Sequence, residues 1–137
     1  MEAIVRYDGG VRFEAEARGH RIVSDQPLES GGEDAGMTPP ELLLASLGTC
    51  VGYYAAQYLR VHKLPVEDLT VRVEAEKAAH PARLGTFRIE VESPAATEER
   101  HREGLLRAAH KCLIHNTLMV APSIEIAVPV PTPAGVA

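Results

Sequence analysis

Hydrophobic and polar residues alternate along six short segments of the chain, as they do in β-strands that bury one face. These segments are residues 3–7, 11–17, 21–23, 69–76, 86–92 and 124–128. Short turns separate the first three segments, which therefore predict a three-stranded meander. A loop rich in glycine, serine and acidic residues follows at residues 25–37, and a turn near residues 80–83 joins the fourth and fifth segments.

A different pattern begins at Thr38. A capping hydroxyl, two prolines and the acid Glu41 are typical of a helix start, and residues 42–59 then contain no charged side chain. The uncharged run is about the minimum length for a membrane span, but Gly48, Gly52 and other interruptions argue against one. We expect a helix buried on nearly all sides. Because so small a chain can hardly surround such a helix alone, we expect a partner subunit to cover part of it.

A second helix is predicted from about residue 97 to Leu113. Acidic residues in its first turn favour the helix dipole, and its apolar positions recur at helical spacing. These positions are Leu105, Ala108, Ala109 and Cys112. The resulting order, βββαββαβ, predicts an α+β fold. We expect a single domain over residues 1–128, followed by a proline-rich C-terminal tail at residues 129–137.

Composition excludes several classes of function. The chain has 137 residues and a formal net charge of −5, and no dense basic run would attract nucleic acid or an anionic membrane. Residues 1–6 lack the basic start and apolar block of a signal peptide, which predicts a cytoplasmic protein with reduced thiols. The single asparagine and two glutamines fit a thermophile, a hypothesis that rests on composition alone.

Two cysteines are the main candidates for chemistry. Cys50 lies in the uncharged helix and Cys112 lies near the end of the second helix, so only tertiary structure could bring them together. A free cysteine is also a common small core residue, and each of these could be no more than that. A zinc site is not expected, because there is no Cys-x-x-Cys motif and the group His110, Cys112 and His115 lacks a fourth ligand.

Other candidates have simpler alternative roles. His115 could donate a hydrogen bond to the nearby thiol, or the segment after Cys112 could cap the helix. Asp25 could bind a polar ligand group, although a turn-forming role is more usual for an aspartate in such a loop. Tyrosines at positions 53, 54 and 58 favour packing over catalysis, and the alternating acids of residues 74–92 favour a solvated strand face.

Two motifs carry a family resemblance. Residues 36–50, GMTPPELLLASLGTC, and residues 112–118, CLIHNTL, resemble the two cysteine motifs of the OsmC/Ohr superfamily. The second motif usually reads Cys-Pro-x-His/Ser-x-x-Leu. The predicted order of strands and helices is similar to that of the superfamily up to about Val128. The form of the first motif is closer to the uncharacterised OsmC-like branch than to Ohr or OsmC proper.

The resemblance implies both a fold and a chemistry. It implies two sheets wrapped around central helices in an intertwined homodimer, with sites at the subunit interface. It also implies thiol-dependent reduction of organic hydroperoxides, as part of an oxidative or osmotic stress response. Cys50 would be the peroxidatic thiol and Cys112 the resolving thiol, with an external dithiol as reductant and with no cofactor or metal. Apolar walls for a small apolar hydroperoxide would come from Leu43, Leu47, Val51 and Tyr54.

The sequence departs from the peroxidases of this superfamily at the helix start. Those enzymes carry Asn-Pro-Glu-Glu/Gln-Leu, whose first glutamate orients an arginine. Here Pro40 takes that position, and Glu41 comes one residue late, about 100° further around the helix. Residues 26–59 also contain no lysine, arginine or histidine. Thiolate support would have to come from another group, and we take Arg18, Arg21, Glu41 and His115 as candidates.

Without a nearby cation, burial should disfavour the thiolate and raise the pKa of Cys50. The departure also leaves two other functions open. One is a non-catalytic OsmC-like dimer that binds a small apolar ligand. The other is a thiol sensor or transferase that uses Cys50 against other electrophiles.

Overall fold

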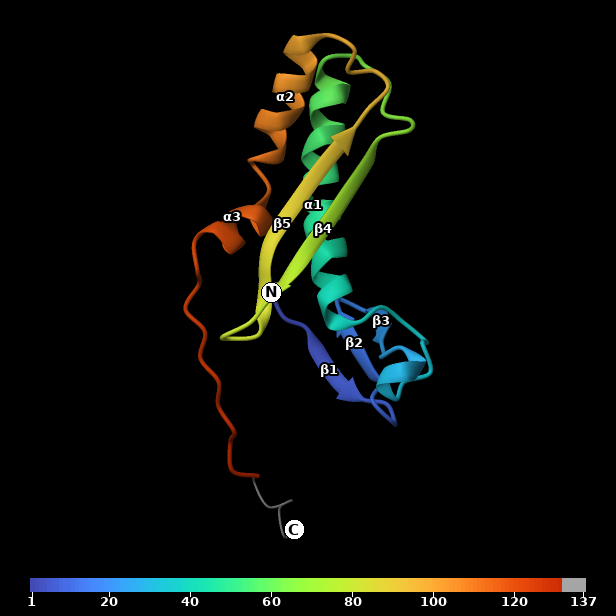
Figure 1. Ribbon diagram of the computed structural model, residues 1–137, viewed down its shortest axis with the longest axis vertical. Coiled ribbons are helices and arrows are strands. Elements are labelled where there is room, and N and C mark those ends of the chain that lie inside the picture. The colour runs from blue at the N-terminus through green and yellow to red at the C-terminus, as the bar shows by residue number, and fades with distance from the viewer. Residues whose placement is uncertain (132–137) are drawn as a thin grey trace.

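The computed structural model describes residues 1–131 and contains two antiparallel sheets and three α-helices (Figure 1). In chain order the elements are β1 (Ile4–Tyr7), β2 (Phe13–Ala17), β3 (His20–Ser24), the 3-10 helix η1 (Leu28–Ser30), α1 (Pro39–Val61), β4 (Thr70–Ala78), β5 (Arg83–Glu92), α2 (Glu99–Ala109) and α3 (Leu113–Met119). The predicted α+β class is confirmed.

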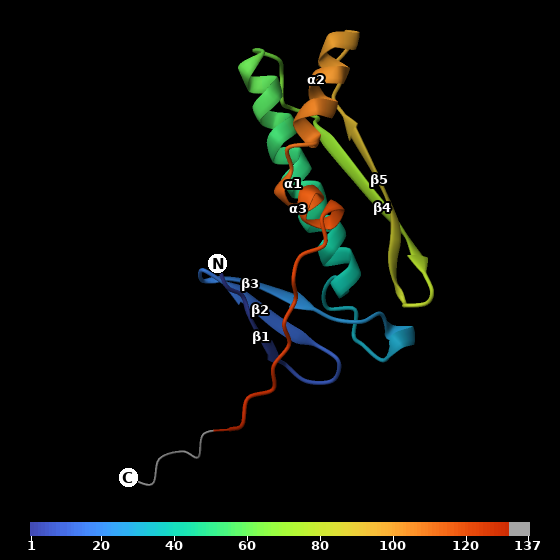
Figure 2. The ribbon, with the colours of Figure 1, turned by 90° about the vertical axis from the view of Figure 1, so that its left-hand side faces the viewer.

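The C-terminal part of the chain forms a two-layer unit in which α1 and α2 lie side by side and the β4–β5 hairpin packs on α1 (Figures 1 and 2). The start of α1 is fixed by a capping box, in which Thr38 and Glu41 satisfy each other's backbone donors. Residues four positions apart then form the buried stripe of the helix. They are Leu47, Val51, Ala55 and Leu59. In this single chain α1 is therefore buried along one side and not on nearly all sides.

Alternation sets the inner face of the hairpin. Val71 and Val73 of β4 and Phe87 and Ile89 of β5 pack against the α1 stripe, while the acids between them are exposed. This confirms the predicted solvated strand face. Within residues 1–131, none of the helices is long and apolar enough to cross a membrane.

The first three strands form the predicted meander, in the order β1-β2-β3. Figure 2 shows this sheet beyond the N-terminal end of α1, away from α2. Within residues 1–131 it packs extensively against no helix and not against the β4–β5 hairpin. No residue of its three strands is fully buried.

The loop between β3 and α1 is held by Asp25, which is 2% exposed. Its carboxylate accepts hydrogen bonds from the backbone N–H groups of Gln26 at 2.8 Å, Glu33 at 3.0 Å and Ala35 at 3.1 Å. These bonds lower the pKa of Asp25, and the bond from Ala35 has the largest effect. Burial acts in the opposite direction but is outweighed. The turn-forming interpretation of Asp25 therefore agrees with the structure, which occupies the carboxylate with backbone donors.

Two predicted elements near the C-terminus are wrong. The second helix does not continue to Leu113 but ends at Ala109, and a separate helix α3 starts after Cys112, whose backbone is not helical (φ −59°, ψ 124°). Residues 124–128 form no strand. Their alternation is real, but a strand needs a neighbouring strand edge for its N–H and C=O groups, and among residues 1–131 no strand pairs with this segment. Of the predicted proline-rich tail, residues 132–137 lie outside the described part.

Candidate functional site

The two cysteines meet where the start of α3 packs on the middle of α1. Cys112 is fully buried in one apolar cluster with Leu47 and Val51, and the half-buried Cys50 packs against that cluster. The side chain of each cysteine shifts the pKa of the other. Residues 62 positions apart in the sequence are thus brought into side-chain contact.

Helix α3 begins with sulfur as its cap. The sulfur of Cys112 accepts a hydrogen bond from the backbone N–H of His115 at 3.3 Å. The backbone N–H groups of Ile114 and Leu113, in the same turn, lie near enough to Cys50 to lower its pKa. The first turn of a helix has free N–H donors, and here the Cys112 sulfur accepts one of them. Sequence reasoning missed this arrangement, because cysteine is not among the residues preferred as caps.

The surroundings of the two thiols shift their pKa values in opposite directions. Burial raises the pKa of Cys50, but hydrogen bonds from the Cys112 thiol and from the backbone of Ile114 and Leu113 outweigh it, and the net pKa is lowered. Burial and the Cys50 side chain both raise the pKa of Cys112, more than the backbone N–H groups of His115 and Ile114 lower it. The prediction of a raised Cys50 pKa is therefore wrong, because it considered burial and omitted hydrogen-bond donors.

Both candidate arginines belong to the N-terminal sheet, where one forms ion pairs and the other lies in a turn between strands. Arg21 pairs with Glu14 and Glu16, at 3.4 Å in each case, on the sheet surface. Arg18 lies in the β2–β3 turn with a positive φ of 54°. Within residues 1–131, no lysine or arginine is among the groups that shift the pKa of Cys50. The single chain brings neither arginine to the thiols.

The other two candidates for thiolate support differ in position. Glu41 is held in the capping box by the Thr38 backbone at 2.7 Å and the Thr38 hydroxyl at 2.9 Å. These two hydrogen bonds lower its pKa against the opposing effect of burial. His115, in contrast, contacts the Cys112 sulfur through its backbone N–H at 3.3 Å. Its Nδ1 lies 3.2 Å from Asn116 Oδ1, and its ring is edge-to-face with that of His110, with 5.3 Å between centroids.

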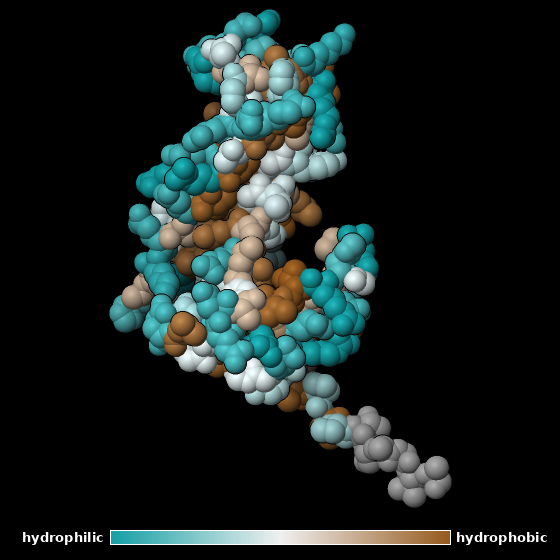
Figure 3. All heavy atoms as spheres, turned by 90° about the vertical axis from the view of Figure 1, so that its right-hand side faces the viewer, coloured by the Kyte–Doolittle hydropathy of each residue, from teal (hydrophilic) through white to brown (hydrophobic). Residues whose placement is uncertain are grey.

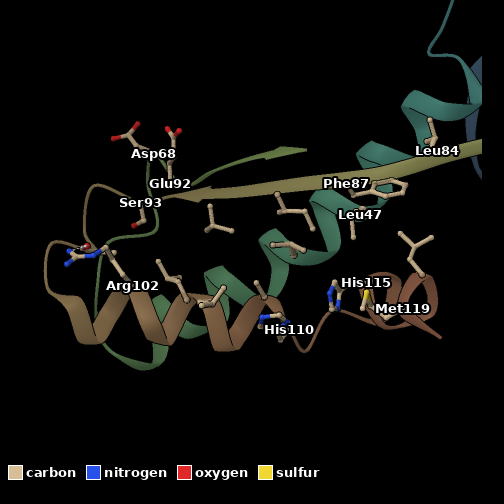
Figure 4. A pocket seen from close by; sticks show the side chains of 18 of the residues that line it. Leu47, Asp68, Leu84, Phe87, Glu92, Ser93, Arg102, His110, His115 and Met119 are labelled. Carbon is tan, nitrogen blue, oxygen red and sulfur yellow. Dashed lines mark hydrogen bonds between the residues drawn. The ribbon is translucent and has the colours of Figure 1, made fainter. Parts of the chain in front are cut away.

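A large cavity adjoins the cysteine cluster. It has a volume of about 1080 Å³ and lies between β5, α1 and the α2–α3 segment. Leu47 and Val51 line it, as expected for apolar walls near Cys50, whereas Leu43 and Tyr54 do not. Figure 4 shows His110 and His115 along one side of the cavity and Phe87 across from them. Neither sulfur lines the cavity, so the cysteines lie directly behind its wall.

No group of three or more histidine, cysteine, aspartate or glutamate residues in the described chain is arranged to hold a metal ion. The side chains at the junction can instead supply two sulfur atoms, backbone donors and imidazole. This set of groups is suited to thiol chemistry.

Comparison with known families decides the relationship of the chain. The sequence model of the OsmC-like protein family matches residues 31–127, well over half of the chain and both cysteine motifs. The chain belongs to the OsmC-like family. A comparison with curated proteins found no match to this OsmC-like chain.

Solved structures share the OsmC-like fold at low sequence identity. A putative osmotic stress induced and detoxification response protein from Psychrobacter arcticus has a TM-score of 0.76 and 21% identity, over 84% of this chain and 85% of that one. An OsmC-like protein from Mycoplasma pneumoniae has a TM-score of 0.69 and 20% identity, over 88% and 87% of the two chains. An organic hydroperoxide resistance protein OsmC from Legionella pneumophila has a TM-score of 0.57 and 22% identity, over 86% and 89%. At these identities the likeness shows a common fold.

Proposed function

We propose that this OsmC-like chain reduces organic hydroperoxides, with Cys50 as the peroxidatic thiol and Cys112 as the resolving thiol. The observation that carries the proposal is the contact between these two thiols, with the pKa of one lowered and that of the other raised. The description of the Legionella relative as an organic hydroperoxide resistance protein supports the same chemistry.

Accessibility and ionisation favour the same assignment of roles. Cys50 is half-buried whereas Cys112 is 0% exposed, so a small molecule would reach Cys50 first. The thiolate is the nucleophile, and Cys50 is the thiol whose pKa is lowered. Cys112, whose pKa is raised, stays protonated until it attacks.

The reaction then proceeds in three steps. The Cys50 thiolate attacks the outer oxygen of the hydroperoxide, the O–O bond breaks, and Cys50 becomes a sulfenic acid while the alkoxide takes up a proton as an alcohol. Cys112 attacks the sulfenic sulfur, and water leaves as the disulfide forms. An external dithiol reduces this disulfide and is itself oxidised. The electrons that reduce the hydroperoxide come from sulfur in every step.

Single-turnover oxidation with cumene hydroperoxide tests the assignment. The wild-type chain should lose two hydrogens by mass spectrometry, as expected for an intramolecular disulfide. Cys112→Ser should still consume one equivalent of hydroperoxide and should stop at sulfenic acid, whereas Cys50→Ser should consume none. A Cys50→Ser variant that reacts as fast as the wild type would contradict the proposal.

We also propose that the working unit is a homodimer. The two faces of the N-terminal sheet differ: one carries ion pairs between Arg6 and Glu16 and between Arg21 and Glu14, and the other is apolar. Residues that share this apolar face by strand register are Val5, Tyr7, Phe13, Ala15 and Ile22. Figure 3 shows hydrophobic atoms left uncovered in the hollow between this sheet and the helical part.

Two further segments support a second subunit. The exposed side of α1 has an uncharged stripe that includes Thr49, Tyr53 and Gln57. The apolar residues of the expected last strand are also exposed, for example Ile126 at 90%. A stable monomer rarely leaves this much apolar surface uncovered. A second subunit could offer a strand edge whose backbone groups bond to the N–H and C=O groups of residues 124–128. It could also cover the apolar face of the N-terminal sheet.

The cavity favours a second candidate function, the binding of a small apolar molecule without turnover. Its volume of about 1080 Å³ is at the upper end of ligand pockets, and neither sulfur lines it. Isothermal titration with cumyl alcohol, the reduced product, would detect such binding. Tight binding together with no consumption of hydroperoxide by a thiol that still alkylates would favour the binding function over the reductase.

A further inference from the structure

We infer that His115 is the proton donor to the alkoxide that leaves in the first step. This inference rests on the proposed hydroperoxide chemistry and assigns a catalytic group within it. It concerns the imidazole of a single residue on α3, whose backbone N–H already contacts the Cys112 sulfur at 3.3 Å.

The first step needs an acid. When Cys50 attacks, an alkoxide leaves, and an alkoxide is a strongly basic and therefore poor leaving group unless a proton reaches it as the O–O bond breaks. The backbone N–H groups of Leu113 and Ile114 stabilise the sulfur, but an amide does not give up its proton. The Cys112 thiol is a weak acid here, because burial and Cys50 raise its pKa.

His115 is the group best placed to supply the proton. It is half-buried at the start of α3 and lines the cavity beside Leu47, which lies one turn before Cys50 on α1 (Figure 4). Its Nδ1 lies 3.2 Å from Asn116 Oδ1. An amide oxygen only accepts hydrogen bonds, so Nδ1 carries a hydrogen and Nε2 is left to take up and release the transferable proton.

The other charged or titratable groups around this cavity are less suitable. His110 lies edge-to-face with His115 at 5.3 Å, but it is exposed and no hydrogen bond in the described chain fixes its ring. Asp68, Glu92 and Arg102 also line the cavity, and Figure 4 shows them at its opposite end. No charged residue of α1 lies between Glu41 and Arg60.

The proton balance of the step is complete. The Cys50 thiolate forms the new S–O bond, the hydroperoxide O–O bond breaks, and the imidazolium of His115 gives its Nε2 proton to the leaving alkoxide. The products are the sulfenic acid, the alcohol and a neutral imidazole. Solvent water then reprotonates His115 before the next turnover.

Variation of the leaving group tests this role. An alkyl hydroperoxide releases a basic alkoxide, whereas a peroxyacid releases a weakly basic carboxylate that needs no proton. In stopped-flow oxidation of Cys50, His115→Gln should react with cumene hydroperoxide about 100-fold more slowly than the wild type, which is typical of a lost general acid. Its reactions with peroxybenzoic acid and with iodoacetamide should remain unchanged.

Two further variants complete the experiment. His110→Gln changes the neighbouring imidazole of the cavity wall, and it should slow cumene hydroperoxide and peroxybenzoic acid to the same extent, because His110 has no part in the proton transfer. His115→Asn serves as a second substitution, and circular dichroism should show that both variants at position 115 are folded. Equal slowing with both oxidants, or no slowing with either, would overturn the role of His115. A wild-type chain that alkylates but does not react with either oxidant would instead overturn the proposed function itself.

Discussion

The two sheets of this chain make opposite use of their apolar faces. The β4–β5 hairpin buries its inner face on α1, and the residues beneath it, such as Leu47 and Leu59, are at most 1% exposed. The N-terminal sheet has an apolar face of similar composition, yet its Tyr7 is 67% exposed and its Ile22 is 49% exposed. One sheet finds its partner layer within the chain, and the other has none there.

This difference indicates where stability and assembly are encoded. A domain needs two packed layers around a core, and α1, α2, β4 and β5 satisfy this requirement by themselves. The N-terminal sheet is a single layer, so its apolar face contributes free energy only when another molecule covers it. Substitutions in the two regions should therefore change different measured quantities.

The largest effect is expected in the helical core. Leu59→Ala should lower the free energy of unfolding by about 2–5 kcal/mol, because it removes a fully buried side chain and leaves a cavity. Urea denaturation followed by circular dichroism measures the change. Leu28→Ala is the matched control in the N-terminal part, where Leu28 is 72% exposed, and it should change the free energy by less than about 0.5 kcal/mol. Similar losses for both would remove the distinction between the regions.

A second substitution addresses the uncovered face of the N-terminal sheet. Ile22→Glu would place a charge on the apolar face and should convert the proposed dimer into a monomer, because an unpaired charge is costly to bury. Val23→Glu is the matched control, since strand alternation directs Val23 to the face that carries Glu14 and Arg6. Light scattering at micromolar concentration should give the monomer mass for Ile22→Glu alone. A wild-type chain that is already monomeric would refute the dimer.

Packing between α1 and α2 should also be sensitive to small changes. In Gly104→Ala the added methyl group would collide with the ring of Tyr58, and overpacking of this kind costs about 1–3 kcal/mol. Gly52→Ala is the control within α1, because its methyl group would stand 3.6 Å from Val71, an ordinary contact. Thermal unfolding should show a lower Tm for Gly104→Ala and an unchanged or slightly higher Tm for Gly52→Ala.

The smallest effect on stability is expected from substitution of Asp25, and its size should depend on pH. Its folded-state pKa is lowered by backbone hydrogen bonds, so the stabilisation is present above the usual aspartate pKa and is lost as pH falls through the lower folded-state value. The protection factors of the amides of residues 26–36, corrected for the intrinsic exchange rate at each pH, should therefore fall at acidic pH in the wild type. Asp25→Asn should show fast exchange already at pH 7, because an amide oxygen cannot replace the carboxylate. Equal protection in both proteins at pH 7 would contradict this role.

Much of the fold could be predicted because local patterns and local packing agree. The capping signal from Thr38 to Glu41 and the alternation along β4 and β5 act between near neighbours in the chain. The prediction failed where a distant contact decides the local structure. At Cys112, apolar spacing favoured a continuing helix, but the chain turns there and the thiol caps α3 on the surface of α1. At residues 124–128, alternation predicted a strand, but the described part of the chain offers that segment no strand to pair with.

The candidate site was predictable only in part. The motif resemblance identified Cys50 and Cys112, and the position of His115 shortly after Cys112 placed it among the candidates. The proposed roles of Arg18 and Arg21 stay predictions that require a second subunit, since the single chain places neither beside the thiols. The expected direction of the Cys50 pKa was wrong, because the donors that lower it are backbone groups of α3. The thermophile hypothesis also stays a prediction.

By itself, the sequence determined the class of fold, the family and the two sulfur atoms, because periodicity and motifs are properties of neighbouring residues. Only the tertiary structure decided which thiol ionises first. That preference depends on the thiol–thiol contact and on the N–H groups of Leu113 and Ile114, which turn toward Cys50 only once α3 has packed on α1. Hydrogen bonds of this kind act over about 3 Å, and a chain separation of 62 residues carries no information about them until the chain is folded.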